Sequence, residues 1–325
     1  MGLDETMKPK VFVTRRLPQT AWEALTPHVE ADLWDYESPP PYETLLEKVR
    51  GIDGLLCLLT DRIDAQLIST GKNLKVISQI AVGFDNIDVD TATQHGIRVG
   101  NTPGVLTDAT ADHTFTLLMA AARRIGEGID YVHQGHWETW GLTLLLGQEV
   151  FGATLGLIGF GRIGQAVAKR ATGFDMRILY NDRSRKVEAE REFGAEYRPL
   201  EELLQTADYV SLHVDLNDTT RGLIGRRELN LMKPTAILIN TARGPIVDQE
   251  ALYEALSEKQ IFYAALDVTE PEPLPADDKL LTLPNIIVVP HIASATVASR
   301  TKMCLMAVDN LLAGLRDEPL PFPVN

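Results

Sequence analysis

"TLGLIGFGRIG", residues Thr154–Gly164, decides the fold, because it joins an apolar strand to the start of a helix through three glycines. Gly159 permits a tight turn, Gly161 lets the backbone approach a pyrophosphate, and Gly164 allows the helix to pack closely against the strand. The helix that begins near Arg162 offers free N–H donors and a partial positive charge to phosphate groups. A purely structural glycine turn is the alternative. The flanking strand and helix favour a dinucleotide-binding unit.

An acidic residue, Asp182, follows the next predicted strand, "RILYN". Its carboxylate can accept hydrogen bonds from both ribose hydroxyls of NAD and repel the 2′-phosphate of NADP. The continuation "DRSRK" also supplies Arg183 and Arg185, which could cradle that phosphate or simply form a charged surface turn. The sequence therefore favours NAD(H) and leaves NADP(H) open.

Strands and helices alternate on both sides of the glycine motif. The predicted strands are apolar runs bounded by turn residues: "KVFVT", "GLLCLL", "KVISQI" and "IRVGN" before the motif, and "TLGLIG", "RILYN", "YVSLHV", "AILINT", "YAALDV" and "IIVVP" from the motif onward. Helices are predicted around Trp22, Leu45 and Ala65, within residues 101–124, and over 299–315. This alternation predicts parallel sheets. Because the motif comes after a whole α/β unit, the cofactor domain is expected to be inserted into a second domain.

The composition narrows the classes of function. A length of 325 residues suggests two domains, and a net charge of −14 argues against binding to nucleic acid or to anionic membranes. No apolar run is long enough to span a membrane or to act as a secretory signal. Gly2 and Thr6 fit a myristoylation pattern, but no basic cluster supports it, so a chance match is preferred. Cys57 and Cys304 lie in apolar surroundings, which predicts buried thiols in a reducing cytoplasm.

Three polar residues follow strand ends in the second half of the chain: Arg243, Glu272 and His291. The carboxyl ends of parallel strands face one crevice, so these side chains could converge beside a nicotinamide. Arg243 could anchor and polarise a 2-oxo acid, His291 could deliver a proton, and Glu272 could orient the imidazole. Each could instead be structural, as a surface arginine or a hydrogen-bonded core histidine is.

Eight motifs spread along the chain then point to one family. They are "LLCLLTDRID", "AVGFDNIDVD", "NTPGVLTDATAD", "GFGRIGQAVAKR", "INTARGPIVDQEAL", "LDVTEPEPLP", "PHIASAT" and "NLLAGLRDEPLP". With them the chain resembles the D-isomer-specific 2-hydroxyacid dehydrogenases, and among these the glyoxylate/hydroxypyruvate reductases. The resemblance implies that Arg243 clamps the substrate, that Glu272 partners the histidine, and that His291 is the general acid in reduction.

The resemblance also implies roles for further residues. The backbone N–H groups of Val82 and Gly83 match those that bind the substrate carboxylate. Cofactor contacts are implied for Thr107, Arg162, Ile163, Thr241, Ala242 and Asp267, beside Gly159, Gly161, Gly164, Asp182 and Arg183. Relatives that prefer NADPH tend to have a small residue where this chain has Asp182, so their cofactor choice is not transferred.

The segment "HQGHWETWGLTLLLGQEVFG" has no clear period and is expected to be an irregular arm or a partner surface. In related reductases this arm crosses to the second subunit, so a homodimer is expected, with Trp140 rather than Trp137 as the residue that reaches a neighbouring pocket. His133 and His136 form a possible metal half-site, but no third ligand is evident and no metal is expected.

We therefore expect a two-domain α/β protein, in which a Rossmann-type doubly wound parallel sheet (104–291) is inserted into a flavodoxin-like α/β substrate domain (1–103 and 292–325). The expected reaction is hydride transfer from NAD(P)H to a small 2-oxo acid such as glyoxylate or hydroxypyruvate, giving the D-2-hydroxy acid in the cytoplasm. Leu58 and Leu59 suit a compact substrate. Two alternatives remain open: a 2-ketogluconate-type reductase of the same family, and a dinucleotide-sensing protein that binds a partner.

Overall fold

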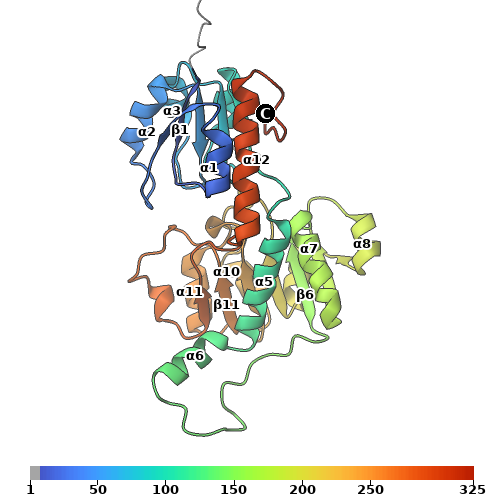
Figure 1. Cartoon of the computed structure of the whole chain (residues 1–325). Helices are drawn as coiled ribbons and strands as arrows, with labels where there is room; N and C mark the ends of the chain where they lie inside the picture. Colours follow the sequence, from blue (N-terminus) through green and yellow to red (C-terminus); the bar gives the residue numbers. More distant parts are fainter. Residues whose placement is uncertain (1–7) are drawn as a thin grey trace, which may run out of the picture. The chain divides into compact units, whose positions relative to one another are not determined.

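The computed structural model describes residues 8–325, so the myristoylation pattern at Gly2 and Thr6 lies outside the described residues. The chain divides into two compact units. One contains the residues up to Leu106 together with Thr296–Asn325, and the other contains Thr107–Ala295. Each unit is a parallel sheet covered by helices (Figure 1).

The unit of Thr107–Ala295 is built on a seven-stranded parallel sheet in the order β12-β11-β10-β9-β6-β7-β8. Counted from β6, this is the doubly wound 3-2-1-4-5-6 order with one added strand. Its strands are β6 (Thr154–Ile158), β7 (Arg177–Asn181), β8 (Glu196–Tyr197), β9 (Tyr209–Leu212), β10 (Ile237–Asn240), β11 (Tyr263–Leu266) and β12 (Ile286–Val288).

Helices cover both faces of this sheet, which is why its central strands are continuously apolar rather than alternating. The helices are α5 (Thr107–Ala122), α6 (Ile125–His133), α7 (Arg162–Ala171), α8 (Val187–Phe193), α9 (Leu200–Thr206), α10 (Arg226–Leu231) and α11 (Gln249–Ser257). Residues of α5 and α7 pack with Leu155 and Leu157 on one face. Residues of α9, α10 and α11 pack with Val210 and Leu238 on the other.

The second unit has a five-stranded parallel sheet in the order β2-β1-β3-β4-β5, which is the flavodoxin-like order. Its strands are β1 (Lys10–Val13), β2 (Glu30–Leu33), β3 (Gly54–Cys57), β4 (Val76–Gln79) and β5 (Arg98–Gly100), and its helices are α1 (Gln19–Leu25), α2 (Tyr42–Lys48), α3 (Ala65–Thr70), α4 (Val89–Gln94) and α12 (Val297–Leu315). One face packs on α1 and α12 and the other on α2, α3 and α4. The predicted fold class is thus confirmed.

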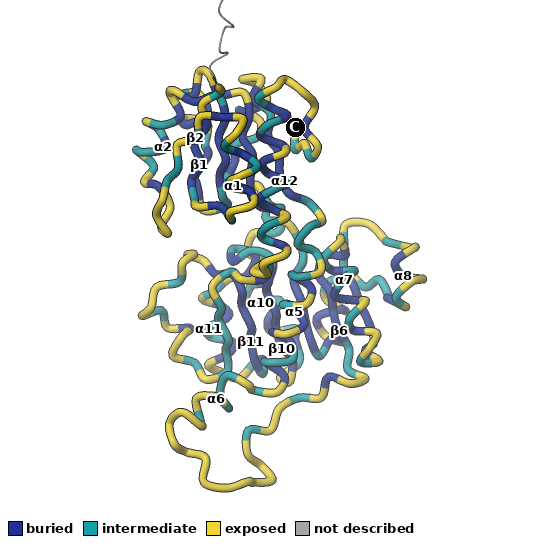
Figure 2. The backbone as a smooth tube through the Cα atoms, in the orientation of Figure 1, coloured by how far each residue is buried: buried dark blue, intermediate teal, exposed yellow. Residues whose placement is uncertain are grey.

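Some elements differ from the prediction. The helix predicted within residues 101–124 is present as α5, but a further helix, α6, follows it after Arg124, whose φ of 52° lies in the left-handed region. Short elements with weak apolar patterns were missed: β2, β8 and α4. The sequence analysis also missed α6, although Ile125, Ile129 and Val132 recur in it at helical spacing. The predicted irregular segment between α6 and β6 has no helix or strand, and Figure 2 shows it as largely exposed.

Candidate active site

The glycine loop after β6 has the geometry that each glycine was predicted to allow. Gly159 has a φ of +93°, and a Cβ there would lie 2.5 Å from the carbonyl oxygen of His213. A Cβ on Gly164 would lie 2.4 Å from the carbonyl oxygen of Gly159, so the helix can approach the loop only without a side chain. Nothing lies within 4 Å of a Cβ built on Gly161, which leaves open space at the N-terminus of α7. This loop fits a bound pyrophosphate.

The loop also lies at the point where the strand order reverses, between β6 and β9. His213, just after β9, donates its N–H to the carbonyl oxygen of Ile158 at 2.7 Å and so joins the two strand ends. Its ring nitrogen Nε2 lies 2.9 Å from the hydroxyl of Ser211. Burial lowers the pKa of His213 to about 3, so the imidazole is neutral at pH 7. This histidine lines the loop and has no charge to offer a phosphate.

Asp182 follows β7 beside the glycine loop. One carboxylate oxygen accepts the N–H of Phe160 at 2.8 Å, and the other lies 3.4 Å from the N–H of Ser184. Arg183 is exposed, and it forms no ion pair or hydrogen bond among the residues that the structure describes. Arg185 is held in a two-pronged pair with Glu190. Arg183 is therefore unpaired within the described residues, whereas Arg185 is paired with an acidic residue.

The other predicted cofactor residues occupy strand ends and helix starts of the same unit. Thr241 is buried and shares a hydrogen bond of 2.8 Å with the hydroxyl of Thr114 on α5. The remaining ones lie at the start of α5 (Thr107), at the start of α7 (Arg162, Ile163) and after β10 (Ala242).

Three loops at the adjacent carboxyl ends of β10, β11 and β12 bear the predicted catalytic residues. Arg243 stands in the first loop, where the buried side chain of Asn240 donates to the carbonyl oxygen of Arg243 at 2.9 Å. Gly244 follows, and a Cβ there would lie 2.0 Å from the carbonyl oxygen of Thr269 in the second loop. Only glycine permits this approach, which packs the arginine loop directly on the backbone that leads to Glu272.

The second and third loops meet through side chains. Nδ1 of His291 lies 2.5 Å from Oε1 of Glu272, and 22% and 31% of the two side chains are exposed. Because Nδ1 faces the carboxylate, Nε2 is the ring nitrogen left for a substrate. His291 has a φ of +51°, which is uncommon for a residue with a Cβ. This strained backbone aims the ring from the strand end.

Asp267, at the end of β11, braces that strained residue. Its buried carboxylate accepts the N–H groups of Ile292 and Ala293 at 2.7 and 2.9 Å. His113 of α5 faces the same carboxylate, with Nε2 3.3 Å from Oδ1. The predicted cofactor contact of Asp267 stays a prediction, whereas its hydrogen bonds to Ile292 and Ala293 show that it shapes the histidine loop.

Val82 and Gly83 lie in the other unit, in the loop after β4. The side-chain amide of Asn101 donates to the carbonyl oxygen of Val82 at 2.7 Å, and that of Gln79 donates to the carbonyl oxygen of Gly83 at 3.1 Å. With both carbonyls engaged, the two N–H groups form no hydrogen bond within the described chain. Their predicted binding of a substrate carboxylate stays a prediction.

Sequence reasoning missed four supporting residues: Gln79, Asn101, Asn240 and Glu190. The first three had a readable signal, because a polar amide inside or at the end of an apolar strand must find a hydrogen-bond partner. Glu190 had none, since an acidic residue on an exposed helix is ordinary.

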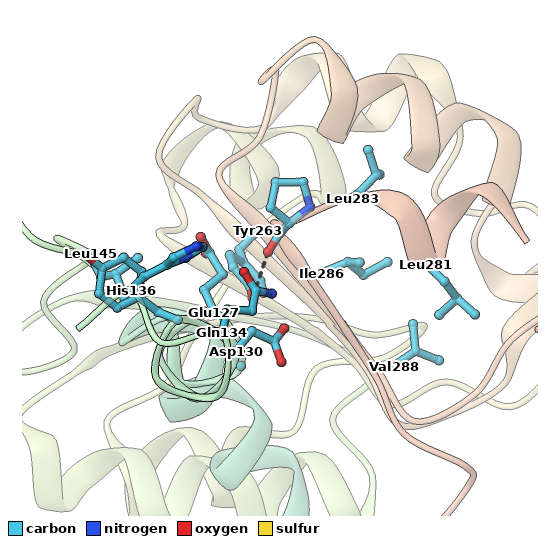
Figure 3. Close-up of a pocket in the computed structure, with 13 residues that line it drawn as sticks. Glu127, Asp130, Gln134, His136, Leu145, Tyr263, Leu281, Leu283, Ile286 and Val288 are labelled. Carbon is cyan, nitrogen blue, oxygen red and sulfur yellow. Dashed lines mark hydrogen bonds between the residues drawn. The ribbon is translucent and has the colours of Figure 1, made fainter. Parts of the chain in front are cut away.

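A cavity of ≈ 360 Å³ in this unit lies elsewhere, between α6, the following arm and β12 (Figure 3). Acidic and polar side chains of α6 and the arm line one side, and apolar side chains near β12 line the other. None of the predicted site residues lines it. Trp137 and Trp140 of the arm are 64% and 76% exposed. Residues 8–325 contain no cluster of three or more side chains arranged to hold a metal.

Comparison with known proteins gives a consistent result. The family model described as "D-isomer specific 2-hydroxyacid dehydrogenase, NAD binding domain" matches residues 115–293. The chain is 52% identical over 320 residues to a glyoxylate reductase of Korarchaeum cryptofilum, covering 98% of this chain and 96% of the relative. It is 51% identical over 322 residues to a glyoxylate reductase of Aeropyrum pernix, with the same coverage.

Solved structures agree with these relatives. A protein from Thermus thermophilus superposes with a TM-score of 0.92 at 48% identity, covering 97% of this chain and all of that one. An NADPH-dependent glyoxylate/hydroxypyruvate reductase from Sinorhizobium meliloti, in complex with NADP and malonate, superposes with a TM-score of 0.86 at 30% identity, covering 98% of this chain and 97% of that one.

Proposed function

The chain belongs to the D-isomer specific 2-hydroxyacid dehydrogenase family, and from this premise we propose that it reduces glyoxylate and hydroxypyruvate with NADH. Membership makes it a nicotinamide-dependent oxidoreductase of 2-oxo and 2-hydroxy acids. The names of its relatives support the particular substrates. The observation that carries the proposal is the 2.5 Å contact of Glu272 with His291, at the same carboxyl edge of the sheet as a glycine loop that fits a dinucleotide.

In this proposal His291 delivers the proton to the substrate. A bound reduced nicotinamide would supply the hydride to the keto carbon. Nε2 of His291 protonates the carbonyl oxygen, while Glu272 holds the imidazole through Nδ1 and stabilises its protonated form. The proton then resides on the product hydroxyl, which balances the reduction.

The substrate carboxylate would be bound by charge and by backbone donors. We propose that the Arg243 guanidinium binds it, because a planar set of N–H groups suits a carboxylate. In the structure one Nη of Arg243 donates to the carbonyl oxygen of Ala242 at 2.8 Å. The N–H groups of Val82 and Gly83 would add two further donors. We propose that the unit of Thr107–Ala295 binds the cofactor and that the other unit binds the substrate, with hinges where the chain crosses near Leu106 and Thr296.

The proposed preference for NADH rests on Asp182. Its carboxylate is held beside the glycine loop by the Phe160 N–H at 2.8 Å, where the ribose hydroxyls of a dinucleotide would lie. Contacts are proposed as well from Thr107, Arg162, Ile163, Thr241, Ala242 and Asp267. A 2′-phosphate would meet the negative charge of Asp182.

We propose a homodimer that covers the arm and α6. Nine large apolar side chains in this region are exposed: Ile125, Ile129, Val132, Trp137, Trp140, Leu142, Leu144, Leu146 and Phe151. Their grouping on one helix and the segment after it is typical of a protein interface. A second copy is the occupant that family membership favours, with Trp140 reaching the partner's pocket.

We propose that the protein is cytoplasmic, and the state of its two cysteines supports this. Cys57 and Cys304 are both buried and unpaired, which suits a reducing environment. No helix among residues 8–325 has the length and apolar character to cross a bilayer.

Initial rates with NADH and NADPH against glyoxylate, hydroxypyruvate, pyruvate and 2-ketogluconate test the proposal. Fast turnover of glyoxylate with NADH is expected. A dominant rate with 2-ketogluconate would favour the sugar-acid alternative. Saturable NADH binding without turnover of any of these acids would favour the dinucleotide sensor instead.

A further inference from the structure

Glu190 on α8 holds the guanidinium of Arg185. Oε1 of Glu190 accepts from Nε of Arg185 at 3.0 Å, and Oε2 accepts from an Nη at 2.6 Å. The side chain of Arg185 is 62% exposed, whereas that of Glu190 is only 14% exposed. The pair therefore joins the exposed guanidinium of Arg185 to the largely buried carboxylate of Glu190.

Glu190 is itself fixed by the sheet. The hydroxyl of Tyr180, in β7, donates to Oε1 of Glu190 at 2.5 Å and accepts the N–H of Lys186 at 2.8 Å. Tyr180 is buried, and its ring stacks on that of Phe160 in the glycine loop, with centroids 4.3 Å apart. Arg185 and then Tyr180 lower the pKa of Glu190, so it is ionised at neutral pH. The Glu190 carboxylate is thus connected through Tyr180 to Phe160 in the glycine loop.

The turn after β7 contains three cations and one acidic residue that matter for a 2′-phosphate, and α8 adds a second acidic residue, Glu190. Asp182 would repel this phosphate, Arg183 is exposed, and Lys186 lies 3.8 Å from a carboxylate oxygen of Asp182. Arg183 and Arg185 both carry a guanidinium, which can bind a phosphate through two parallel N–H bonds. In this chain Glu190 already occupies the guanidinium of Arg185 and offsets its charge.

We propose that Glu190 is a specificity-determining residue that disfavours NADP(H) by withholding Arg185 from the 2′-phosphate. This inference rests on one part of the proposed function, namely that the site binds a nicotinamide dinucleotide. Cofactor choice is then set by two acidic residues in different ways. Asp182 repels the extra phosphate directly, and Glu190 removes one of the cations that would compensate for it, so that only Arg183 remains as an unpaired guanidinium in the turn.

The test uses the variants Glu190→Gln, Arg185→Gln and the double variant, with Glu188→Gln as the matched control. Gln at 190 keeps an oxygen that can accept from Tyr180 but loses the charge that binds Arg185. Glu188 lies on the same helix and is exposed. Its substitution by Gln removes the same charge but breaks no pair with Arg185. Calorimetric titration with NADP⁺ and NAD⁺, without a 2-oxo acid, gives dissociation constants that do not depend on turnover. The ratio of kcat/KM for NADPH to that for NADH is measured in parallel.

Glu190→Gln is expected to tighten NADP⁺ binding roughly tenfold, as a charge-assisted hydrogen bond would, and to change NAD⁺ binding less than about twofold. In the Arg185→Gln background the same substitution should give at most about a third of that gain, because no guanidinium is released. Glu188→Gln should stay within about twofold of the wild type.

Equal gains with and without Arg185, or no gain, would overturn the inference. Should Glu190→Gln fail to fold, Glu190→Asp shortens the reach to Arg185 and keeps the charge, and the same comparison of backgrounds applies. A wild-type protein that binds NAD⁺ but reduces no 2-oxo acid would sink the proposed substrate while leaving this binding test readable.

Discussion

Asp267 hydrogen-bonds to the backbone of His291, whose φ is positive, and to the backbone of the two residues after it. Its backbone carbonyl accepts the His291 N–H at 2.9 Å, and its carboxylate accepts the N–H groups of the next two residues. A left-handed backbone at a residue with a Cβ costs on the order of 1 kcal/mol and persists only where its surroundings enforce it. The Asp267 carboxylate supplies that enforcement, so it stabilises the histidine position as well as any cofactor contact.

Asp267→Asn should therefore impair both stability and turnover. An amide has a single acceptor oxygen, so one of the two backbone N–H groups would face the NH₂ group without a partner. We expect a loss of about 1–3 kcal/mol in unfolding free energy and at least a tenfold lower kcat. Urea unfolding and initial rates measure the two effects. Asp218→Asn, in an exposed loop, is the control, and a variant with wild-type kcat would contradict the bracing role.

His291→Ala should lower turnover far more than cofactor affinity. General acid catalysis by such a group accounts for about 10²–10⁴ in rate, whereas the imidazole is not proposed to contact the phosphates or ribose. Single-turnover rates with glyoxylate and fluorescence titration with NADH separate the two quantities. His95→Ala, an exposed histidine, controls for loss of a ring. Equal turnover in the His291 variant would remove the histidine from the mechanism.

Two glycines of the same loop should behave in opposite ways when changed to alanine. Gly159→Ala forces a Cβ to 2.5 Å from a backbone oxygen at a φ of +93°, so we expect a loss of more than about 2 kcal/mol in stability. Gly161→Ala meets no atom within 4 Å and should keep its melting temperature. It should nevertheless bind NADH at least about tenfold more weakly, because the methyl group enters the space expected for the pyrophosphate. Calorimetry of unfolding and of binding distinguishes them, and a tight-binding Gly161→Ala would argue against the phosphate site.

His213 should make the protein sensitive to mild acid. Burial lowers its pKa from 6.5 to about 3 in the folded state, so below pH 6.5 the unfolded chain binds a proton that the folded chain does not. Its contribution to stability is complete above pH 6.5 and falls by up to about 1.4 kcal/mol per pH unit between pH 6.5 and pH 3. His213→Gln should flatten the stability curve over pH 4.5–6.5 in urea unfolding, while His95→Gln should not. Parallel curves for wild type and His213→Gln would show that the ring protonates in the folded state.

Charges placed on the arm should dissociate the proposed dimer. Leu142 and Leu146 are 80% and 61% exposed, so replacing both by Asp leaves the described packing of the unit intact. We expect a shift from dimer to monomer in light scattering at micromolar concentration, because charged groups would be buried without partners. Tyr36→Asp, at a 64% exposed residue of the other unit, is the control. A wild-type monomer would remove the interface proposal altogether.

Local patterns in the sequence were enough for much of the fold. The apolar runs predicted the ten strands with buried or largely buried centres, and the glycine spacing predicted the turn, the helix start and the close packing that the loop shows. Elements with a weak apolar pattern, such as the edge strand β8, were missed because their side chains meet the core on little of their surface. The helix that starts directly after Arg124 was also missed, since nothing local marks a left-handed residue there that would separate two helices.

The sequence by itself determined which residue types stand at the strand ends, because strand periodicity and turn residues are local properties of the chain. Tertiary structure alone decided which of those ends are neighbours. Strand order brings Glu272 to His291 and places Asp267 under the histidine loop, although these residues are separated along the chain. It also decided that the exposed guanidinium of Arg185 is paired with Glu190. Hydrogen bonds and ion pairs depend on distances of a few ångströms, and the packing of the sheet and its helices sets those distances.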